Sequence, residues 1–171
     1  MTALEYHVLV VLLPLTITNI LHMLVVKWNL LQDLAQPISL PALGKGKTWR
    51  GFLFVTIVNG LVLWLLSLWL QLHLPQALGL GMLLGFAYIL FELPNSYMKR
   101  RLGIPSGSQH PKHAWLFSII DKTDSAFGVM MVYYLVSDIT LAQAITLFLV
   151  SSCTHILLSF LMVSLKLKSS F

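Results

Sequence analysis

Charged residues are scarce in this 171-residue sequence, where Lys, Arg, Asp and Glu together make up 10% of the chain. A typical soluble domain carries charge on about a quarter of its residues. The hydrophobic content of 57% fits a chain that meets lipid rather than water. The shortage of charge therefore excludes an ordinary soluble domain and predicts one all-α integral membrane domain over residues 1–171.

Cysteine and targeting signals are also nearly missing. Cys153 is the single cysteine, so an intrachain disulfide is excluded. The first apolar stretch, which starts at Tyr6, has no basic segment before it and no small-residue cleavage site after it. We therefore expect no cleaved secretory signal.

Five apolar stretches are long enough, or nearly so, to cross a bilayer, and we expect about five transmembrane helices from them. They cover residues 6–26, 52–72, 76–93, 123–136 and 140–165. The fourth is shorter than the usual length of about 20 residues, so it must tilt little or begin among the lipid head groups.

The basic residues alternate with these stretches. All eleven Lys and Arg residues fall in the links 27–51 and 94–122 or in the C-terminal tail, and the other two links have none. The positive-inside rule then predicts an inner (cytoplasmic) membrane protein with the N-terminus outside and the C-terminus in the cytoplasm. The net charge of +5 is explained by topology and anionic lipids, so we expect no nucleic-acid partner. We expect the active site on the cytoplasmic face, in the two basic loops.

Two acidic residues, Asp121 and Asp124, open the fourth stretch three positions apart and would share a helix face. Paired carboxylates beside basic loops favour Mg²⁺ held by oxygen ligands and by substrate phosphates, with Glu92 as a third candidate ligand. The alternative is that Asp121 caps the helix and Asp124 complements its dipole. Gly128, one turn further, would leave room for a neighbouring helix.

Two basic motifs flank the second and third stretches. GKGKTWRG (44–51) lacks the first glycine of a nucleoside-triphosphatase loop, because Pro41 stands there. One interpretation is a glycine turn with cations at the start of a helix, which could bind a phosphate group. The alternative is a basic flank that sets the membrane topology, with Trp49 as an interfacial anchor. NSYMKRRLGIPSG (95–107) has a dense cationic cluster that can hold a triphosphate or an anionic lipid.

The strings GKGKTWRG, FELPNSYMKRRLGI and DKTD, in this order between Ala42 and Gly128, resemble the CDP-archaeol synthase family. These are membrane CTP-dependent cytidylyltransferases related to the CDP-diacylglycerol synthases. The resemblance implies transfer of CMP from CTP to a lipid phosphate, with Mg²⁺ as cofactor and pyrophosphate as the second product. The chain differs from the common pattern at Lys45, which replaces an acid, and at Glu92, which replaces Asp.

The motifs and the resemblance together suggest roles for eleven residues. The expected metal ligands are Asp121, Asp124 and Glu92. The expected nucleotide-binding residues are Lys47, Thr48, Trp49 and Ser96. The cations expected to neutralise phosphates during catalysis are Lys47, Arg50, Lys99, Arg100 and Arg101. No general base is needed, because a lipid phosphate is already ionised near neutral pH.

Other functions use the same residue types. Another phosphoryl-transfer enzyme of lipid metabolism would need the same acids and cations with a different donor. A non-catalytic membrane subunit or a small carrier of anions or lipids would need no turnover, although no charged residue near mid-membrane supports a carrier. The sequence leaves the oligomeric state open, and a homo-oligomer is one of the possible states.

Overall fold

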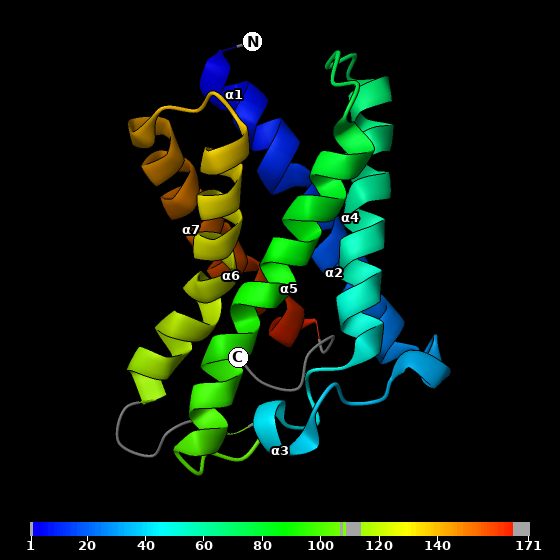
Figure 1. Cartoon of the computed structure of the whole chain (residues 1–171), viewed down its shortest axis with the longest axis vertical. Coiled ribbons are helices and arrows are strands. Elements are labelled where there is room, and N and C mark those ends of the chain that lie inside the picture. Colours follow the sequence, from blue (N-terminus) through cyan, green and yellow to red (C-terminus); the bar gives the residue numbers. More distant parts are fainter. Residues whose placement is uncertain (1, 107, 109–113, 166–171) are drawn as a thin grey trace.

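The computed structural model describes residues 2–106, 108 and 114–165 (Figure 1). Within these ranges the chain is helical and contains no β-strand, only an isolated antiparallel bridge between Pro37 and Thr48. The expected all-α class is therefore confirmed.

The helices follow one another along the chain with short links. The first membrane-length segment is continuous and consists of α1 (Ala3–His7), the π-helical η1 (Val8–Leu12) and α2 (Leu13–Lys27). The first basic loop contains the 3₁₀ turn η2 (Gln32–Leu34) and the short α3 (Leu40–Leu43). The remaining helices are α4 (Trp49–Trp69), α5 (Ala77–Arg101), α6 (Ala114–Val136) and α7 (Leu141–Ser164).

Four helical segments of the described chain are long and apolar enough to cross a membrane. They are Ala3–Lys27, Trp49–Trp69, Ala77–Arg101 and Leu141–Ser164. α6 is equally long, but its first half carries Asp121, Lys122 and Asp124. The integral membrane character is confirmed by four helices, while the fifth span and the orientation across the membrane stay predictions.

The helix boundaries around the second basic loop differ from expectation. α5 continues through Pro94 to Arg101, and α6 begins at Ala114, well before residue 123. The segment between the two helices is therefore much shorter than the expected loop 94–122. Asp121 lies inside α6, so the interpretation of this residue as an N-cap is wrong. Hydropathy identified only the apolar parts of α5 and α6, whereas both helices continue into polar residues at the ends next to this loop.

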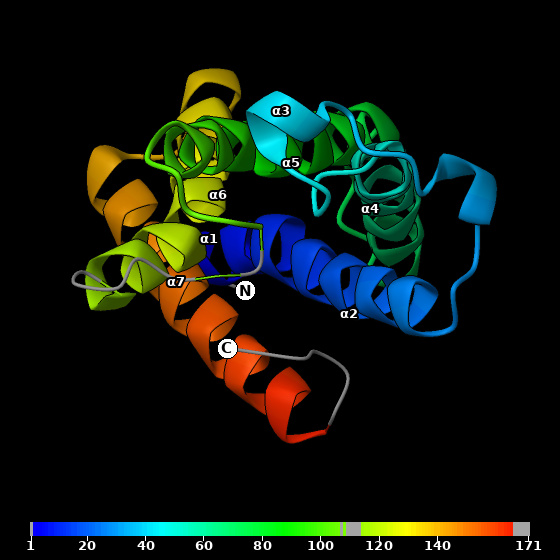
Figure 2. The ribbon, with the colours of Figure 1, turned by 90° about the horizontal axis from the view of Figure 1, so that it is seen from below.

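The helices form a bundle in which α5 packs between α4 and α6, with α2 against α4 and α7 against α6 (Figures 1 and 2). The core is apolar, as expected for helices whose side chains face one another. Its fully buried members include Val10, Val11, Leu63, Leu84 and Leu147.

The contact between α4 and α5 depends on two glycines. A Cβ atom on Gly81 would lie 2.7 Å from the Asn59 carbonyl oxygen, and one on Gly85 would lie 2.6 Å from the Val55 carbonyl oxygen. The buried Asn59 side chain donates a hydrogen bond to the Gly81 carbonyl (2.7 Å) and ties the two helices together. Small residues four apart thus allow the close packing of these two helices.

The motif-bearing segments meet at one end of the bundle. The first basic loop with α3, the C-terminal end of α5 and the start of α6 lie at the lower end in Figure 1, whereas the α4–α5 and α6–α7 links lie at the upper end. We call the lower end the basic end. Lys112, Lys166 and Lys168 lie outside the described residues.

Candidate active site at the basic end

The two aspartates of α6 converge on one atom of α5. Asn95 Nδ2 donates hydrogen bonds to Asp121 Oδ1 (2.7 Å) and to Asp124 Oδ2 (2.9 Å). Asn95 is itself buried, with 9% of its surface exposed. The expected shared face of Asp121 and Asp124 is thus observed, and both carboxylates point toward the same place from α6.

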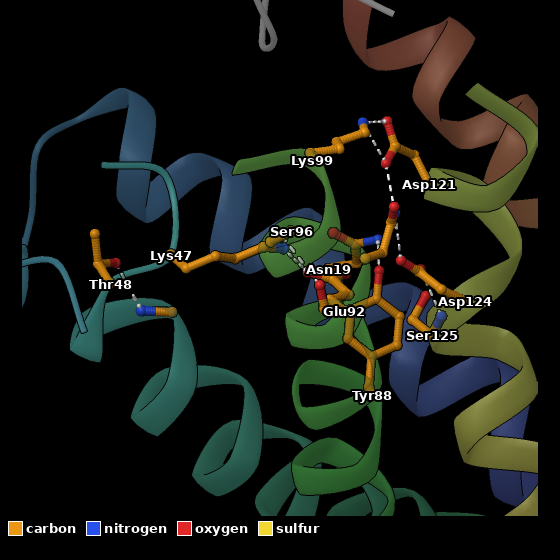
Figure 3. Close-up of polar contacts among 12 residues, drawn as sticks. Asn19, Lys47, Thr48, Tyr88, Glu92, Ser96, Lys99, Asp121, Asp124 and Ser125 are labelled. Carbon is orange, nitrogen blue, oxygen red and sulfur yellow. Dashed lines mark hydrogen bonds and ion pairs between the residues drawn. The ribbon is translucent and has the colours of Figure 1, made fainter. Parts of the chain in front are cut away.

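Lys99 completes this cluster. It lies one helical turn beyond Asn95, so both side chains project from the same face of α5. Its ammonium group donates to Asp121 Oδ1 (2.6 Å) and pairs with the other oxygen of that carboxylate (Figure 3). The Phe117 ring lies 5.7 Å from the same ammonium group. A buried cation therefore pairs with Asp121, and Asn95 links that carboxylate to Asp124.

Arg100 and Arg101, the other two cations of the NSYMKRRLGIPSG motif, face away from the aspartates. Arg101 is exposed, and its guanidinium lies 5.9 Å from the Tyr97 ring. Arg100 packs near Gly44 of the first basic loop, with its Cδ 3.5 Å from where a Cβ of that glycine would be. The buried Nε of Arg100 has no hydrogen-bond partner among the described residues. Among the described residues, Lys99 is the one member of this motif's three cations that pairs with an aspartate, Asp121.

The first basic loop is joined to α5 by an ion pair between Lys47 and Glu92. Lys47 reaches α5 from the α4 side, whereas the aspartates reach it from the α6 side (Figure 3). Burial alone would lower the pKa of Lys47, but the Glu92 carboxylate outweighs it and raises that pKa above its ordinary value. Lys47 is therefore charged at neutral pH.

Glu92 has different hydrogen-bond partners from the two aspartates. Its carboxylate binds Lys47, and its backbone carbonyl accepts a hydrogen bond from the Ser96 hydroxyl (3.0 Å). Within the described part of the chain, no three His, Cys, Asp or Glu side chains are placed to share a metal ion. Glu92 is thus observed as the partner of Lys47, and its expected role as a metal ligand stays a prediction.

The start of α4 presents the other residues of the GKGKTWRG motif. Thr48 is the N-cap, and its hydroxyl accepts a hydrogen bond from the Gly51 N–H (3.3 Å). Arg50 is 8% exposed and donates Nη1 to the Leu30 carbonyl (2.9 Å), while its buried Nε has no partner among the described residues. Trp49 is exposed, which agrees with an interfacial anchor.

A cavity of about 260 Å³ opens between this loop, α2, α4 and α5. Its polar lining consists of Lys45, Lys47, Thr48, Arg50, His22 and Glu92, and its apolar walls include Phe52 and Ile89. Three cations and one carboxylate give it a net positive lining. Such a cavity, large enough for a small molecule and with a buried unsatisfied Arg50 Nε, suits an anion that also carries an apolar face.

Asn95 was not anticipated from the sequence. The relevant signal is its spacing, because it lies four residues before Lys99 and so shares a helix face with that lysine. Pro94 obscured this signal, since proline usually marks the end of a helix. Once α5 is known to continue through Pro94, the same periodicity identifies Asn95.

The groups around Asn95 fit a hard divalent cation. Two carboxylates converge on its Nδ2, and a half-turn of the amide would place its Oδ1 at that point instead. Carboxylate and amide oxygens are the ligands that Mg²⁺ accepts, usually together with water and substrate phosphates. Asp121, Asp124 and Asn95 are therefore the candidate set.

The chain is similar in sequence to several CDP-archaeol synthases. A CDP-archaeol synthase of Thermococcus kodakarensis is 29% identical over 116 residues, which cover 66% of this chain and 64% of that protein. One from Methanopyrus kandleri is 33% identical over 94 residues (55% and 49%), and one from Thermococcus gammatolerans is 40% identical over 68 residues (38% and 40%). The matched regions thus span between 40% and 64% of these relatives.

No solved structure matches the chain. The family model described as CarS-like, CDP-archaeol synthase, in contrast, matches residues 1–171, which is the entire sequence. The resemblance seen in the three motifs is therefore confirmed, and the chain belongs to the CarS-like CDP-archaeol synthase family.

Proposed function

We propose that this protein transfers CMP from CTP to a lipid phosphate, giving a CDP-activated lipid and pyrophosphate. Family membership and the similarity to CDP-archaeol synthases support this reaction. The observation that carries the proposal is the convergence of Asp121 and Asp124 of α6 on α5, where Lys99 pairs with Asp121. The same helix α5 carries Glu92, which forms the ion pair with Lys47. Anion-binding and cation-binding groups thereby meet at one end of a membrane bundle.

The cavity beside Lys47 is the proposed nucleotide site. Lys45, Lys47 and Arg50 provide positive charge for a triphosphate, and the Arg50 Nε still has a hydrogen bond to give. The lipid phosphate would approach from the bilayer to Lys99 and the aspartates. α5, which carries both Glu92 and Lys99, places the two sites next to each other.

The reaction joins two polyanions, so positioning and charge neutralisation dominate it. An oxygen of the lipid phosphate attacks the α-phosphorus, the bond to the β-phosphate oxygen breaks, and its electron pair leaves with pyrophosphate. Asp121, Asp124 and Asn95 would hold Mg²⁺, which when bound neutralises phosphate charge at the reacting centre.

The chain's own cations do the remaining work. Lys99 would orient the lipid phosphate, which is already ionised and needs no general base. Lys47 and Arg50 would bind the outer phosphates and stabilise the charge that develops on the departing pyrophosphate. We also propose that the basic end faces the cytoplasm, where CTP is available, as the positive-inside rule predicts.

Transfer from purified protein in detergent tests the reaction directly. With Mg²⁺ and a lipid phosphate, label in the α-phosphate of CTP is expected to enter the organic phase, whereas label in the γ-phosphate stays in water. Entry of the γ-label would indicate a kinase, and transfer from ATP or nucleotide-sugars in preference to CTP would indicate another phosphoryl enzyme. Absence of label in lipid with every donor would support a subunit or carrier.

A further inference from the structure

Lys122 stands between the two aspartates in the DKTD motif (121–124), but its side chain reaches a different helix. Asp121 and Asp124 point from α6 toward α5. The Lys122 ammonium group instead donates a hydrogen bond to the Ser159 hydroxyl of α7 (3.0 Å). Lys122 is 5% exposed and Ser159 is 4% exposed, so this contact lies inside the bundle. Successive residues of a helix point about 100° apart, and one turn of α6 thereby contacts both α5 and α7.

His155 of α7 holds the backbone of the same lysine. Its Nδ1 lies 3.1 Å from the Lys122 carbonyl oxygen. A carbonyl oxygen can only accept a hydrogen bond, so Nδ1 carries a proton and donates to it. The other ring nitrogen, Nε2, lies 3.3 Å from the Tyr88 hydroxyl of α5. His155 and Ser159 are one helical turn apart, so one face of α7 holds both the carbonyl and the ammonium group of Lys122.

The rotation of α6 about its axis decides whether its aspartates reach Asn95. Helices inside a bilayer gain little from hydrophobic burial against one another, so hydrogen bonds and close packing determine how each helix is turned. The two contacts from α7 fix the DKTD turn of α6 in rotation and in height. Groups that orient the ligands of a metal ion change metal affinity about 10- to 100-fold, so a fixed turn matters for a metal centre.

We propose that His155 is a positioning residue of the metal centre, which holds the DKTD turn through the Lys122 carbonyl. By fixing this turn, His155 directs Asp121 and Asp124 toward Asn95. This inference rests on the proposed function, in which the two aspartates bind Mg²⁺. His155 acts here through the backbone of α6, as the donor of one hydrogen bond.

Three substitutions of His155 separate this role from the contact with Tyr88. In His155→Asn the amide nitrogen lies near the former position of Nδ1 and can still donate to the Lys122 carbonyl. In His155→Gln the longer side chain brings the amide toward the Tyr88 hydroxyl instead, and His155→Leu has no polar atom. We expect Mn²⁺ affinity to be about 10- to 100-fold weaker in His155→Leu and His155→Gln, and within about threefold of the unaltered protein in His155→Asn.

Electron paramagnetic resonance of the purified protein measures Mn²⁺ binding without turnover. The Mn²⁺ concentration that gives half-maximal CMP transfer should rise by the same factor as the binding weakens. Leu147→Ala is the control for lost packing, because Leu147 is fully buried about two turns away on the same helix. This variant should lower the melting temperature and leave the Mn²⁺ affinity unchanged.

Other results would overturn the proposal. Unchanged Mn²⁺ affinity in His155→Leu, or an equal loss of affinity in Leu147→Ala, would reject a positioning role for His155. Near-normal binding in His155→Gln with weak binding in His155→Asn would assign the effect to the Tyr88 contact instead. CMP transfer whose metal dependence is the same in all His155 variants would retain the proposed reaction and reject the positioning role. Mn²⁺ binding that depends on His155 in a protein that transfers no CMP would retain the positioning role and reject the reaction.

Discussion

Replacing Asp124 by Asn is expected to reduce CMP transfer by roughly a thousandfold or more, with the protein still folded. The change keeps the size of the side chain but removes the negative charge that faces Asn95. Groups that neutralise charge at a reacting centre contribute about a hundredfold to a thousandfold each, and loss of a metal ligand also weakens the ion. The measurement is the initial rate of α-label transfer from CTP at saturating Mg²⁺.

Asp121→Asn is expected to give a loss of the same order, because both carboxylates converge on one point. Asp138→Asn is the matched control, since this exposed residue follows the opposite end of α6. It should leave the rate unchanged. Near-normal transfer by both Asp121→Asn and Asp124→Asn would exclude a metal role for this pair.

Replacing Lys47 by Met is expected to raise the KM for CTP by at least roughly 30-fold. The variant loses a cation from the nucleotide cavity and leaves Glu92 without its ion-pair partner. In the complex, Lys47 would pair with a phosphate of CTP; truncating one member of such a desolvated charged pair costs about 2–5 kcal/mol, and each 1.4 kcal/mol changes affinity about tenfold. Steady-state kinetics with varied CTP measures the effect, and Lys27→Met, at an exposed position, is the control.

The double variant Lys47→Met with Glu92→Gln separates two roles of Glu92. If Glu92 mainly neutralises Lys47, removing its charge relieves repulsion of the CTP phosphates and recovers about tenfold of the lost affinity. If it were a metal ligand, as expected from the sequence, the second change would lower kcat further. A further loss of kcat would therefore contradict the assignment of Glu92 as a partner of Lys47.

Several features of this site could be predicted from the sequence because they depend on local spacing. Residues three apart share a helix face, and Asp121 and Asp124 do converge. Gly81 and Gly85 are four apart, a spacing typical of close helix packing, and both lie against α4. Basic links alternate along the chain with links that lack Lys and Arg, and this pattern predicted that the motif-bearing segments share one end of the bundle. Figure 1 shows these segments at one end.

Other features depend on tertiary contacts or on helix ends, which composition describes poorly. Lys99, Arg100 and Arg101 are consecutive, but each residue turns about 100° around the helix, so they face different surroundings. The pairing of Lys47 with Glu92 joins a loop to a helix 45 residues away and has no local signal. The length of α6 was missed because its polar first half hides it from hydropathy.

The central claim is that Asp121 and Asp124 hold a divalent cation where the nucleotide and the lipid phosphate meet, and Mn²⁺ binding tests it most directly. In electron paramagnetic resonance of the purified protein with a non-hydrolysable CTP analogue, we expect bound Mn²⁺ with hyperfine coupling to phosphorus. Binding should weaken at least tenfold in Asp121→Asn and Asp124→Asn and stay unchanged in Asp138→Asn. Equal Mn²⁺ affinity in all four proteins, or bound Mn²⁺ without coupling to phosphorus, would contradict the claim.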